Sequence, residues 1–356
     1  MDRKENRNMN KNVTNLFVCL LIGIVIGAGT VLVVMSPSGQ ATYTVTTAGS
    51  TTLYQLSQEW ATRFQEDFPA FMVNPAAGGS GLGQSQVAEG LIHIGASSSY
   101  PSADYRGNNT NVKILPMSAD ALAIVVNPSV NGSIFRLDSD MAVAVFQGNI
   151  TTWEDFESTF SVQVAAAGEI EVFVRSDASG TTATFGKWLM TSTSNPNPHA
   201  NFTWTLGDHE AIAWAAGINA VVGNLGVASG VEANIKAIGY VGLAFTEGLT
   251  DAELYNYGNG QWVASSLENA LKAIPSELAD PGQNLMNSPT PDAYPIARLL
   301  YYLVNEENLP WYVIVFLDWA IAQGQGYAAG VGYVPINGTA AALYTLNALG
   351  TLAPSA

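Results

Sequence analysis

The sequence predicts an α/β protein with parallel sheets that carry helices on both faces. Short β-type runs alternate with amphipathic helical runs along most of the chain, and this alternation is typical of parallel sheets. Of the 356 residues, 48% are apolar and 12% are charged, which excludes a disordered chain. At roughly 100–200 residues per domain, this length indicates two domains or one large α/β unit.

The N-terminal region predicts a membrane segment. Residues 1–12 carry four cations and two acids, and the 20 residues 16–35 carry no charge. Twenty helical residues span roughly 30 Å, the thickness of a bilayer core. Because cations collect on the cytoplasmic side, we predict a cytoplasmic segment 1–12, a transmembrane anchor or signal segment 13–35, and an extracytoplasmic remainder. The alternative is a signal peptide that is cleaved near Ser36, although its apolar core is usually only about 7–15 residues long.

The exported part is expected to begin with a strand at 43–47 and a helix from Thr51, on which Leu53, Leu56, Trp60 and Phe64 form one apolar face. Further strands are expected at 91–97, 121–127, 169–174 and 237–245. Further helices are expected at 138–148, 209–218 and 313–329. The turn-rich segment 281–295 is a candidate crossover between lobes.

Charge and cysteine content exclude several functions. Without residues 1–12 the chain has 9 cations and 27 acids, a net charge of −18, so we expect no nucleic-acid partner. The single cysteine, Cys19, excludes an intrachain disulfide framework and a Cys-rich metal site. Such an acidic protein repels anions at long range, so any anion site has to consist of aimed, short-range donors.

Three segments combine a strand-like run, small residues, and a Ser or Thr that opens a helix: 46–53, 74–83 and 173–185. The first N–H groups of a helix have no intrahelical partner and the helix dipole is positive there, so such starts suit an anion. Ser and Thr are also ordinary helix caps, so one such segment alone says little. The third segment adds Arg175, whose planar fork of donors suits an oxyanion, and Asp177, which can hold that fork by ion pairing.

A set of motifs runs in the order found in one protein family. The chain resembles the high-affinity phosphate-binding proteins of ABC-type phosphate importers from about residue 43 to 336. The motifs that carry the resemblance are TAGSTTL, GGSG, IGAS, VFQGNITTWEDF, VRSDASGTTATF, IGYVGLAF and FLDWAIAQGQGYAAGVGYVPI.

This resemblance implies a two-lobed periplasmic-binding-protein fold (type II-like), with two mixed sheets flanked by helices and joined by hinge crossovers. Lobe one would comprise residues 41–118 and 292–356, and lobe two residues 119–291. It implies a monomer that captures inorganic phosphate and delivers it to the permease of an ABC importer, without a cofactor or metal and without chemistry on the ligand. The residues implied for binding are Thr51, Thr52, Ser80, Ser98, Arg175, Asp177, Ser179, Gly180 and Thr181.

One position departs from the family pattern. Many family members have an aspartate after the IGAS-like run, where it accepts the proton of phosphate and repels sulfate, and Ser98 stands at that position here. Binding of another tetrahedral oxyanion (sulfate, arsenate or molybdate) is therefore kept as an alternative. A surface sensor or adhesion protein that retains the fold is the alternative from another class.

Other chemistry has weaker support. The adjacent residues Asp208, His209 and Glu210 are of metal-ligand type, but their spacing does not place the three side chains on one helix face, and we expect them to open a helix. No GxSxG motif occurs in the sequence, and the three histidines are scattered. We therefore expect a binding protein and not an enzyme.

Overall fold

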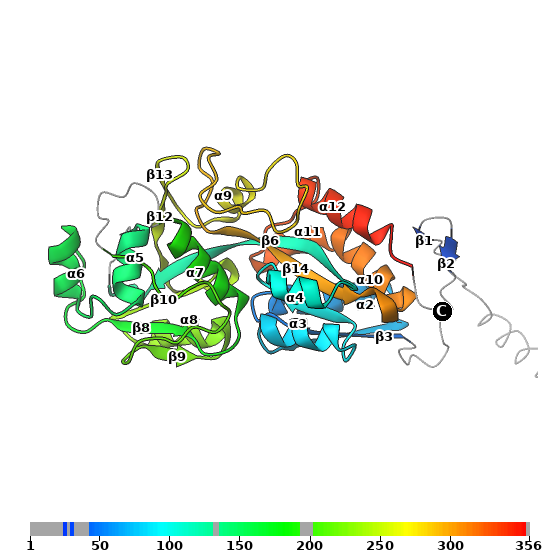
Figure 1. Ribbon diagram of the computed structural model, residues 1–356, viewed down its shortest axis with the longest axis horizontal. Helices are drawn as coiled ribbons and strands as arrows, with labels where there is room; N and C mark the ends of the chain where they lie inside the picture. Colours follow the sequence, from blue (N-terminus) through cyan, green and yellow to red (C-terminus); the bar gives the residue numbers. More distant parts are fainter. Residues whose placement is uncertain (1–23, 27–28, 32–42, 131–134, 193–201, 354–356) are drawn as a thin grey trace, which may run out of the picture.

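The computed structural model describes residues 24–26, 29–31, 43–130, 135–192 and 202–353. Figure 1 shows two halves side by side along the longest axis, with the strand β6 (Val112–Val126) running from one into the other. Lobe one contains the strands and helices of residues 43–108 and 311–349, and lobe two contains those of residues 139–242. The predicted two-lobed α/β architecture is thus present.

A nine-stranded mixed sheet runs through both lobes in the order β4-β3-β5-β14-β6-β10-β8-β9, with β11 paired to β6. Its strands are β3 (Tyr43–Gly49), β4 (Phe71–Ala77), β5 (Ile94–Ser97), β6 (Val112–Val126), β8 (Glu171–Arg175), β9 (Asn219–Val221), β10 (Ala237–Gly242), β11 (Thr250–Asp251) and β14 (Ala297–Asn305). A smaller sheet holds β7 (Arg136–Leu137), β12 (Glu253–Asn256) and β13 (Gln261–Val263).

Strand β6 joins the two sheets that the sequence predicted. It pairs antiparallel with β14 through residues 112–121 and with β10 through residues 122–126. Because every residue of β14 is buried, this strand lies deep in the molecule beside the boundary between the lobes. In the register of the two strands, Arg298 is the partner of Asp120.

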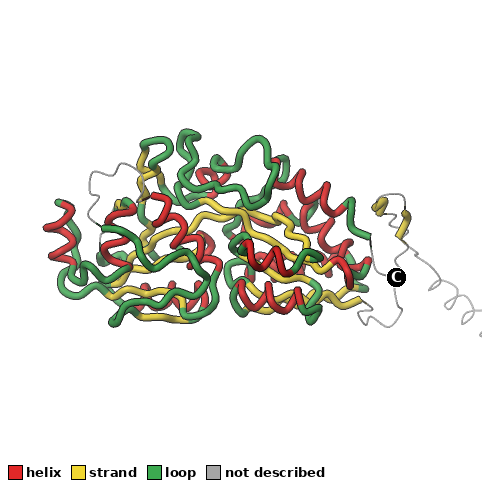
Figure 2. The backbone as a smooth tube through the Cα atoms, in the orientation of Figure 1, coloured by secondary structure: helices red, strands yellow, loops and turns green. Residues whose placement is uncertain are grey.

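Helices cover both faces of the strands in each lobe (Figure 2). Lobe one has α2 (Tyr54–Asp67), α3 (Ser80–Ala88), α4 (Ala103–Asn108), α10 (Trp311–Ile321), α11 (Gln325–Ala328) and α12 (Ala340–Leu349). Lobe two has α5 (Ser139–Phe146), α6 (Trp153–Phe160), α7 (Gly180–Ser192) and α8 (Gly223–Ala233), and α9 (Leu267–Leu271) lies against β6 and β14.

The core of lobe one confirms the apolar face predicted from Thr51 onward. Leu56, Trp60 and Phe64 of α2 are fully buried. The Trp60 ring lies 5.9 Å from the Tyr302 ring of β14, and the Phe64 ring lies 5.2 Å from the Phe316 ring of α10. These edge-on aromatic contacts fix α2 against the sheet, and thereby place the loop that precedes it.

Two helix predictions need correction. Residues 209–218 are irregular, because their groups bond to distant parts of the chain: the Glu210 carbonyl accepts from Ser179 N, and Trp214 Nε1 donates to the Arg175 carbonyl. The helix predicted at 313–329 is broken into α10 and α11. Trp60 Nε1 donates to the Gly324 carbonyl at 2.7 Å, which directs that backbone group away from the helix.

The predicted strands are present, with shifted ends; the strand expected at 121–127 begins nine residues earlier, at Val112. The sequence did not indicate β14 or α12. Most of the predicted membrane segment lies outside the described residues. Within it, β1 (Ile24–Ile26) and β2 (Gly29–Val31) form a short antiparallel pair. Among the residues that the structure describes, none of the helices combines the length and apolar character needed to span a bilayer.

Candidate functional site

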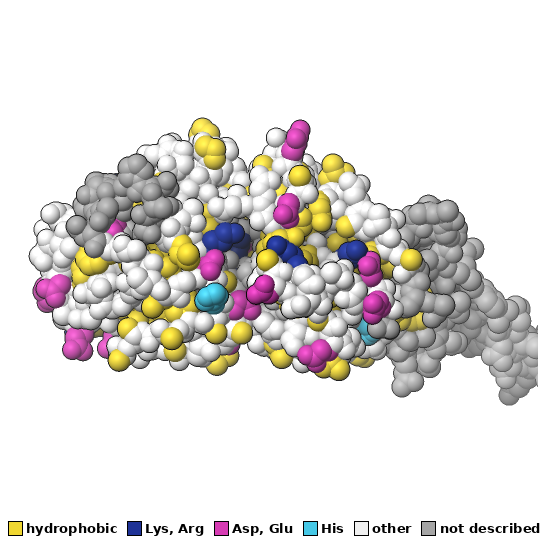
Figure 3. Space-filling view, in the orientation of Figure 1, with side chains coloured by type: hydrophobic (Ala, Val, Ile, Leu, Met, Phe, Trp, Pro, Cys, Tyr) yellow, Lys and Arg dark blue, Asp and Glu magenta, His cyan; other side chains and the backbone are white. Residues whose placement is uncertain are grey.

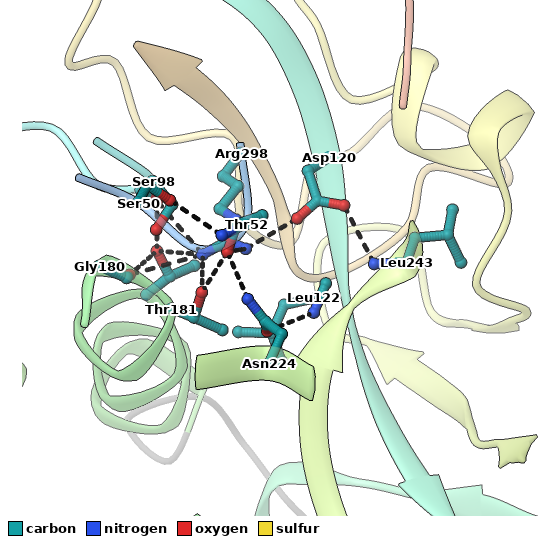
Figure 4. Close-up of polar contacts among 12 residues, drawn as sticks. Ser50, Thr52, Ser98, Asp120, Leu122, Gly180, Thr181, Asn224, Leu243 and Arg298 are labelled. Carbon is teal, nitrogen blue, oxygen red and sulfur yellow. Dashed lines mark hydrogen bonds and ion pairs between the residues drawn. The ribbon is translucent and has the colours of Figure 1, made fainter. Parts of the chain in front are cut away.

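The three helix starts singled out in the sequence meet at the boundary between the lobes. The hydroxyls of Thr52 and Thr181 lie 2.8 Å apart, although 129 residues separate them in the chain. The hydroxyls of Ser80 and Ser98 lie 3.1 Å apart, and a Cβ atom on Gly180 would lie 2.7 Å from each of them. Figure 4 shows Thr52, Ser98, Gly180 and Thr181 turned toward one another.

Serine hydroxyls cap two of these starts. Ser179 Oγ accepts from the amides of Thr181 and Thr182 at 3.1 and 3.2 Å. Ser50 Oγ accepts from the amide of Thr52 at 3.2 Å and from that of Leu53 at 3.4 Å. The side chains of Ser50, Ser179 and Thr181 are buried, so these amides are shielded from water. They are aligned, neutral donors of the kind that an acidic protein needs to hold an anion.

Thr51 lies at the edge of this group and not at its centre. Asn224 Nδ2, at the start of α8, donates to Thr51 Oγ1 at 3.3 Å and to Thr52 Oγ1 at 2.9 Å. Asn224 Oδ1 accepts from the amide of Gly242 at 3.1 Å, so its amide group is fixed in orientation. The sequence analysis missed Asn224, since nothing in its neighbourhood resembles a site.

Arg175 is held as the sequence predicted. Its Nε donates to Asp177 Oδ1 at 2.7 Å, and its Nη2 donates to Asp177 Oδ2. Its carbonyl accepts from Trp214 Nε1 at 3.1 Å. Its third nitrogen, Nη1, is buried and has no hydrogen-bond partner. A buried donor without an acceptor is costly, so Nη1 is available to an oxygen of a bound anion.

The ion pair keeps Asp177 charged. Burial alone would raise the pKa of Asp177, but the hydrogen bonds and charge of Arg175 and the amide of Gly223 outweigh burial and lower it. Asp177 Oδ1 already accepts from Arg175 Nε and from Gly223 N. This carboxylate therefore serves to orient the guanidinium.

A second buried guanidinium, Arg298 of β14, lies at the same place and was missed. Its Nη2 donates to Asp120 Oδ2 of β6 at 2.7 Å, and its Nη1 donates to the Ser98 carbonyl and to Thr181 Oγ1, both at 3.2 Å. Both members of the pair are buried. Burial raises the pKa of Asp120, and the charge of Arg298 opposes this rise. Burial lowers the pKa of Arg298, and the charge of Asp120 opposes this fall.

The sequence contained a signal for this pair. An arginine and an aspartate in otherwise apolar strands have to be paired, because an isolated buried charge is very unfavourable. Among the described residues, Arg175 and Arg298 are the buried cationic side chains.

Glu210 bridges the two lobes beside the site. Its Oε1 accepts from Gln84 Nε2 at 2.8 Å and from Ser99 Oγ at 2.9 Å, both in lobe one. Burial raises the pKa of Glu210, and the two hydrogen bonds oppose this shift. The prediction that residues 208–210 open a helix is therefore wrong, and Glu210 serves as a contact between lobes.

A cavity of about 490 Å³ opens next to Ser98 and Arg298. Side chains of both lobes line it, including Lys187, His209 and Glu210. On the face shown in Figure 3, basic, acidic and histidine side chains gather along the boundary between the lobes. This cavity therefore borders the buried donors at Ser98 and Arg298.

Solved structures share this fold. A putative phosphate ABC transporter substrate-binding protein from Clostridium perfringens, determined with bound phosphate, superposes with a TM-score of 0.63 at 18% identity, covering 83% of this chain and 100% of that chain. A high-affinity periplasmic phosphate-binding protein named PfluDING, bound with phosphate, gives a TM-score of 0.66 at 18% identity, covering 85% and 93%.

Curated proteins are similar in sequence over most of their length. The phosphate-binding protein PstS of Haemophilus influenzae is 28% identical over 312 residues, which are 84% of this chain and 90% of that protein. PstS of Methanocaldococcus jannaschii is 26% identical over 349 residues, which are 87% of each. The family model of the PBP superfamily domain matches residues 35–324, most of the chain. The chain therefore belongs to the PBP superfamily.

Proposed function

We propose that this protein captures inorganic phosphate outside the cytoplasm and delivers it to an ABC-type importer. The observation that carries the proposal is the meeting of three helix starts and a buried, carboxylate-held guanidinium at one place between two lobes. The similar proteins from Haemophilus influenzae and Methanocaldococcus jannaschii, which are named as phosphate-binding, support the choice of ligand.

The proposed site comprises Thr51, Thr52, Ser80, Ser98, Arg175, Asp177, Ser179, Gly180 and Thr181. Thr51, Thr52, Ser80 and Ser98 approach the anion from lobe one, while Ser179, Gly180 and Thr181 approach it from lobe two. On binding, the amides of Thr52 and Thr181 would give up their hydrogen bonds to the serine hydroxyls and donate to the oxygens of the anion instead. Arg175 Nη1 would supply the charge-assisted hydrogen bond, and Asp177 would keep its fork in place. The anion is held without any reaction on it.

Closure of the lobes links binding to transport. An anion that touches both lobes stabilises the closed form, because it makes contacts there that it lacks in the open form. We propose lobe boundaries at 41–118 with 292–356 for lobe one and at 119–291 for lobe two, and that the permease recognises the closed form of the monomer.

The N-terminal region would keep the protein at the membrane. We propose that residues 13–35 attach the protein to the cytoplasmic membrane with residues 1–12 inside, as their apolar run and flanking cations favour. The full chain should then sediment with membranes, while a chain that starts at residue 43 should be released. Recovery of the full chain in the soluble fraction would contradict this attachment.

Replacement of Arg175 tests the proposed site. We expect Arg175→Gln to lower phosphate affinity by about 100-fold or more, because a charge-assisted donor is lost. Isothermal titration calorimetry with phosphate and with sulfate measures the effect, and circular dichroism checks the fold. The matched control is Arg136→Gln, since Arg136 Nε donates to Glu253 at 2.8 Å while its side chain is 52% exposed. Equal affinities of the Arg175 variant and the unaltered protein would refute a site centred on Arg175.

A further inference from the structure

We propose that Arg298 is a second anion-binding guanidinium, which β14 carries and Asp120 positions, so that the oxyanion is held by two arginines. This inference rests on the proposed function, because it adds a binding residue and a positioning residue to the same site. The two residues face each other on neighbouring strands at the boundary between the lobes.

The first support is the position of the guanidinium among the proposed donors. Beyond its bonds to the Ser98 carbonyl and Thr181 Oγ1, Nη1 lies 3.5 Å from the Gly180 carbonyl, and Nη2 lies 3.5 Å from Thr52 Oγ1. Figure 4 shows Arg298 between Ser98 and Gly180 on one side and Asp120 on the other. The fork therefore reaches helix starts from both lobes.

The second support is an unsatisfied donor. Arg298 Nε is buried and has no hydrogen-bond partner, and the same holds for Arg175 Nη1. Each arginine has one carboxylate that fixes it, Asp120 or Asp177, and each keeps one buried N–H without an acceptor. Such donors are rarely left unpaired in a folded protein. One oxyanion between them would give both an acceptor.

The third support is electrostatic. Burial lowers the pKa of Arg298, and the nearby charge of Arg175 lowers it further. A guanidinium stays protonated at physiological pH, so the two cations repel each other, although each is paired with one carboxylate. A dianion bound between them would reduce this repulsion and so offset part of the loss of its own hydration.

The position of the pair also fits a role in closure. Arg298 bonds to the Ser98 carbonyl in lobe one and to Thr181 in lobe two, while Asp120 accepts from the amide of Leu243, which directly follows β10. An anion on Arg298 thus touches both lobes and the strands that connect them. A purely structural role in holding β6 and β14 together is the competing explanation.

The test separates these roles by removing both charges at once. A single replacement leaves the other charge buried and unpaired, whereas an apolar pair of similar volume is often neutral or stabilising. The variant is therefore Asp120→Leu with Arg298→Met, and the matched control is Glu253→Leu with Arg136→Met at the exposed pair. Circular dichroism melts without phosphate measure the fold, and calorimetry with inorganic phosphate measures the affinity.

If Arg298 binds the anion, the Asp120/Arg298 double variant melts cooperatively and its phosphate affinity falls about 10- to 100-fold, while the control keeps its affinity. If the pair only holds the strands, the double variant folds and binds phosphate as the unaltered protein does, which overturns the inference. Should the double variant fail to fold, Arg298→Lys decides. Lysine keeps the charge and the partner Asp120 but lacks the fork, so a normal melt with unchanged phosphate affinity overturns the inference.

Failure of the proposed function would be visible separately. The unaltered protein is titrated with phosphate and with sulfate first. If neither anion binds, both phosphate capture and the role of Arg298 are refuted. Binding by the unaltered protein with no loss in the variants refutes the role of Arg298 alone.

Discussion

At the residue scale, the proposed site combines neutral donors with two guanidinium groups, each held in place by a carboxylate. The hydroxyls and amides of its serines and threonines add no net charge, so the site can exist in a chain with a net charge of −16. Each of the two arginines forms an ion pair with a carboxylate: Arg175 with Asp177, and Arg298 with Asp120. These pairs fix the direction of the remaining N–H groups, which is what a tetrahedral ligand requires.

Position 98 is proposed to influence which anion is favoured. We expect Ser98→Asp to lower sulfate affinity at least about tenfold more than phosphate affinity, because a buried carboxylate repels fully ionised sulfate but accepts the proton that phosphate retains. Calorimetry with both anions at neutral pH measures the ratio. The control, Ser98→Ala, removes the hydroxyl without adding charge, so it should change both affinities alike. If the ratio of phosphate to sulfate affinity is unchanged in Ser98→Asp, position 98 does not distinguish the protonated anion from the fully ionised one.

Glu210 should make stability depend on pH. Because burial raises its pKa, the folded protein takes up a proton there, and the contribution of Glu210 to stability falls as the pH rises from below about 4.3 through the raised pKa. Glu210→Gln keeps an oxygen that accepts from Gln84 and Ser99 but carries no charge. Its melting temperature should exceed that of the unaltered protein at about pH 8, and the two should converge near pH 4.

Other ionisable groups near Glu210 have to be considered when the melting temperatures of the two proteins are compared. Lys187, Asp208 and His209 line the same cavity and are present in both proteins, so their effects cancel in the difference. A melting-temperature difference that stays constant from about pH 4 to pH 8 would contradict a raised pKa at Glu210.

At the scale of elements, the start of α7 lies directly against lobe one. Gly180 lies against Ser80, Ser98 and Ser99, and a Cβ atom there would lie 2.6 Å from the backbone nitrogen of Ser99. The backbone of Gly81 in α3 also donates to the Ala178 carbonyl, just before α7, at 3.3 Å. The helix start can approach the other lobe because residue 180 has no side chain.

We expect Gly180→Ala to hinder closure and leave lobe two folded, because alanine suits a helix but its methyl group would clash with lobe one. Phosphate affinity should fall at least about tenfold, while the melting temperature without phosphate stays close to that of the unaltered protein. Gly326→Ala in α11 is the matched control, since a Cβ atom there meets nothing within 4 Å. Normal phosphate affinity of Gly180→Ala would show that this contact is not needed for binding.

At the scale of the whole molecule, β6 runs from one lobe into the other, pairing with β14 in lobe one and with β10 in lobe two. Residues of the two lobes bond directly at Thr52 with Thr181 and at Gln84 with Glu210. The structure therefore has the lobes closed on each other. Both of these contacts are hydrogen bonds between polar side chains, whose groups water can also satisfy.

We expect the phosphate-free protein to open and phosphate to close it. Small-angle X-ray scattering should give a smaller radius of gyration with saturating phosphate than with sodium chloride of equal ionic strength, because the anion binds the closed form better. The Arg175→Gln protein, which lacks the central donor, should keep the larger radius in both solutions. A radius that phosphate leaves unchanged in the unaltered protein would contradict closure driven by the ligand.

The sequence by itself determined the parts of this protein that depend on neighbouring residues. The three helix starts are local patterns of small and hydroxyl residues, and Arg175 with Asp177 is a pair only two positions apart. The apolar face of α2 follows from spacing within one helix. Local chemistry of this kind stays readable because the interacting groups are joined by a short stretch of chain.

Only the tertiary structure decided the rest. Arg298 meets Asp120 across 178 residues, through the register of two strands that are apolar along most of their length and carry no periodicity. Glu210 and Asn224 likewise reach their partners across 126 and 172 residues, from segments whose local sequence favoured a helix or gave no signal. The energy of these contacts is gained when distant segments pack, so the short-range pattern of the chain does not identify the partner of each residue.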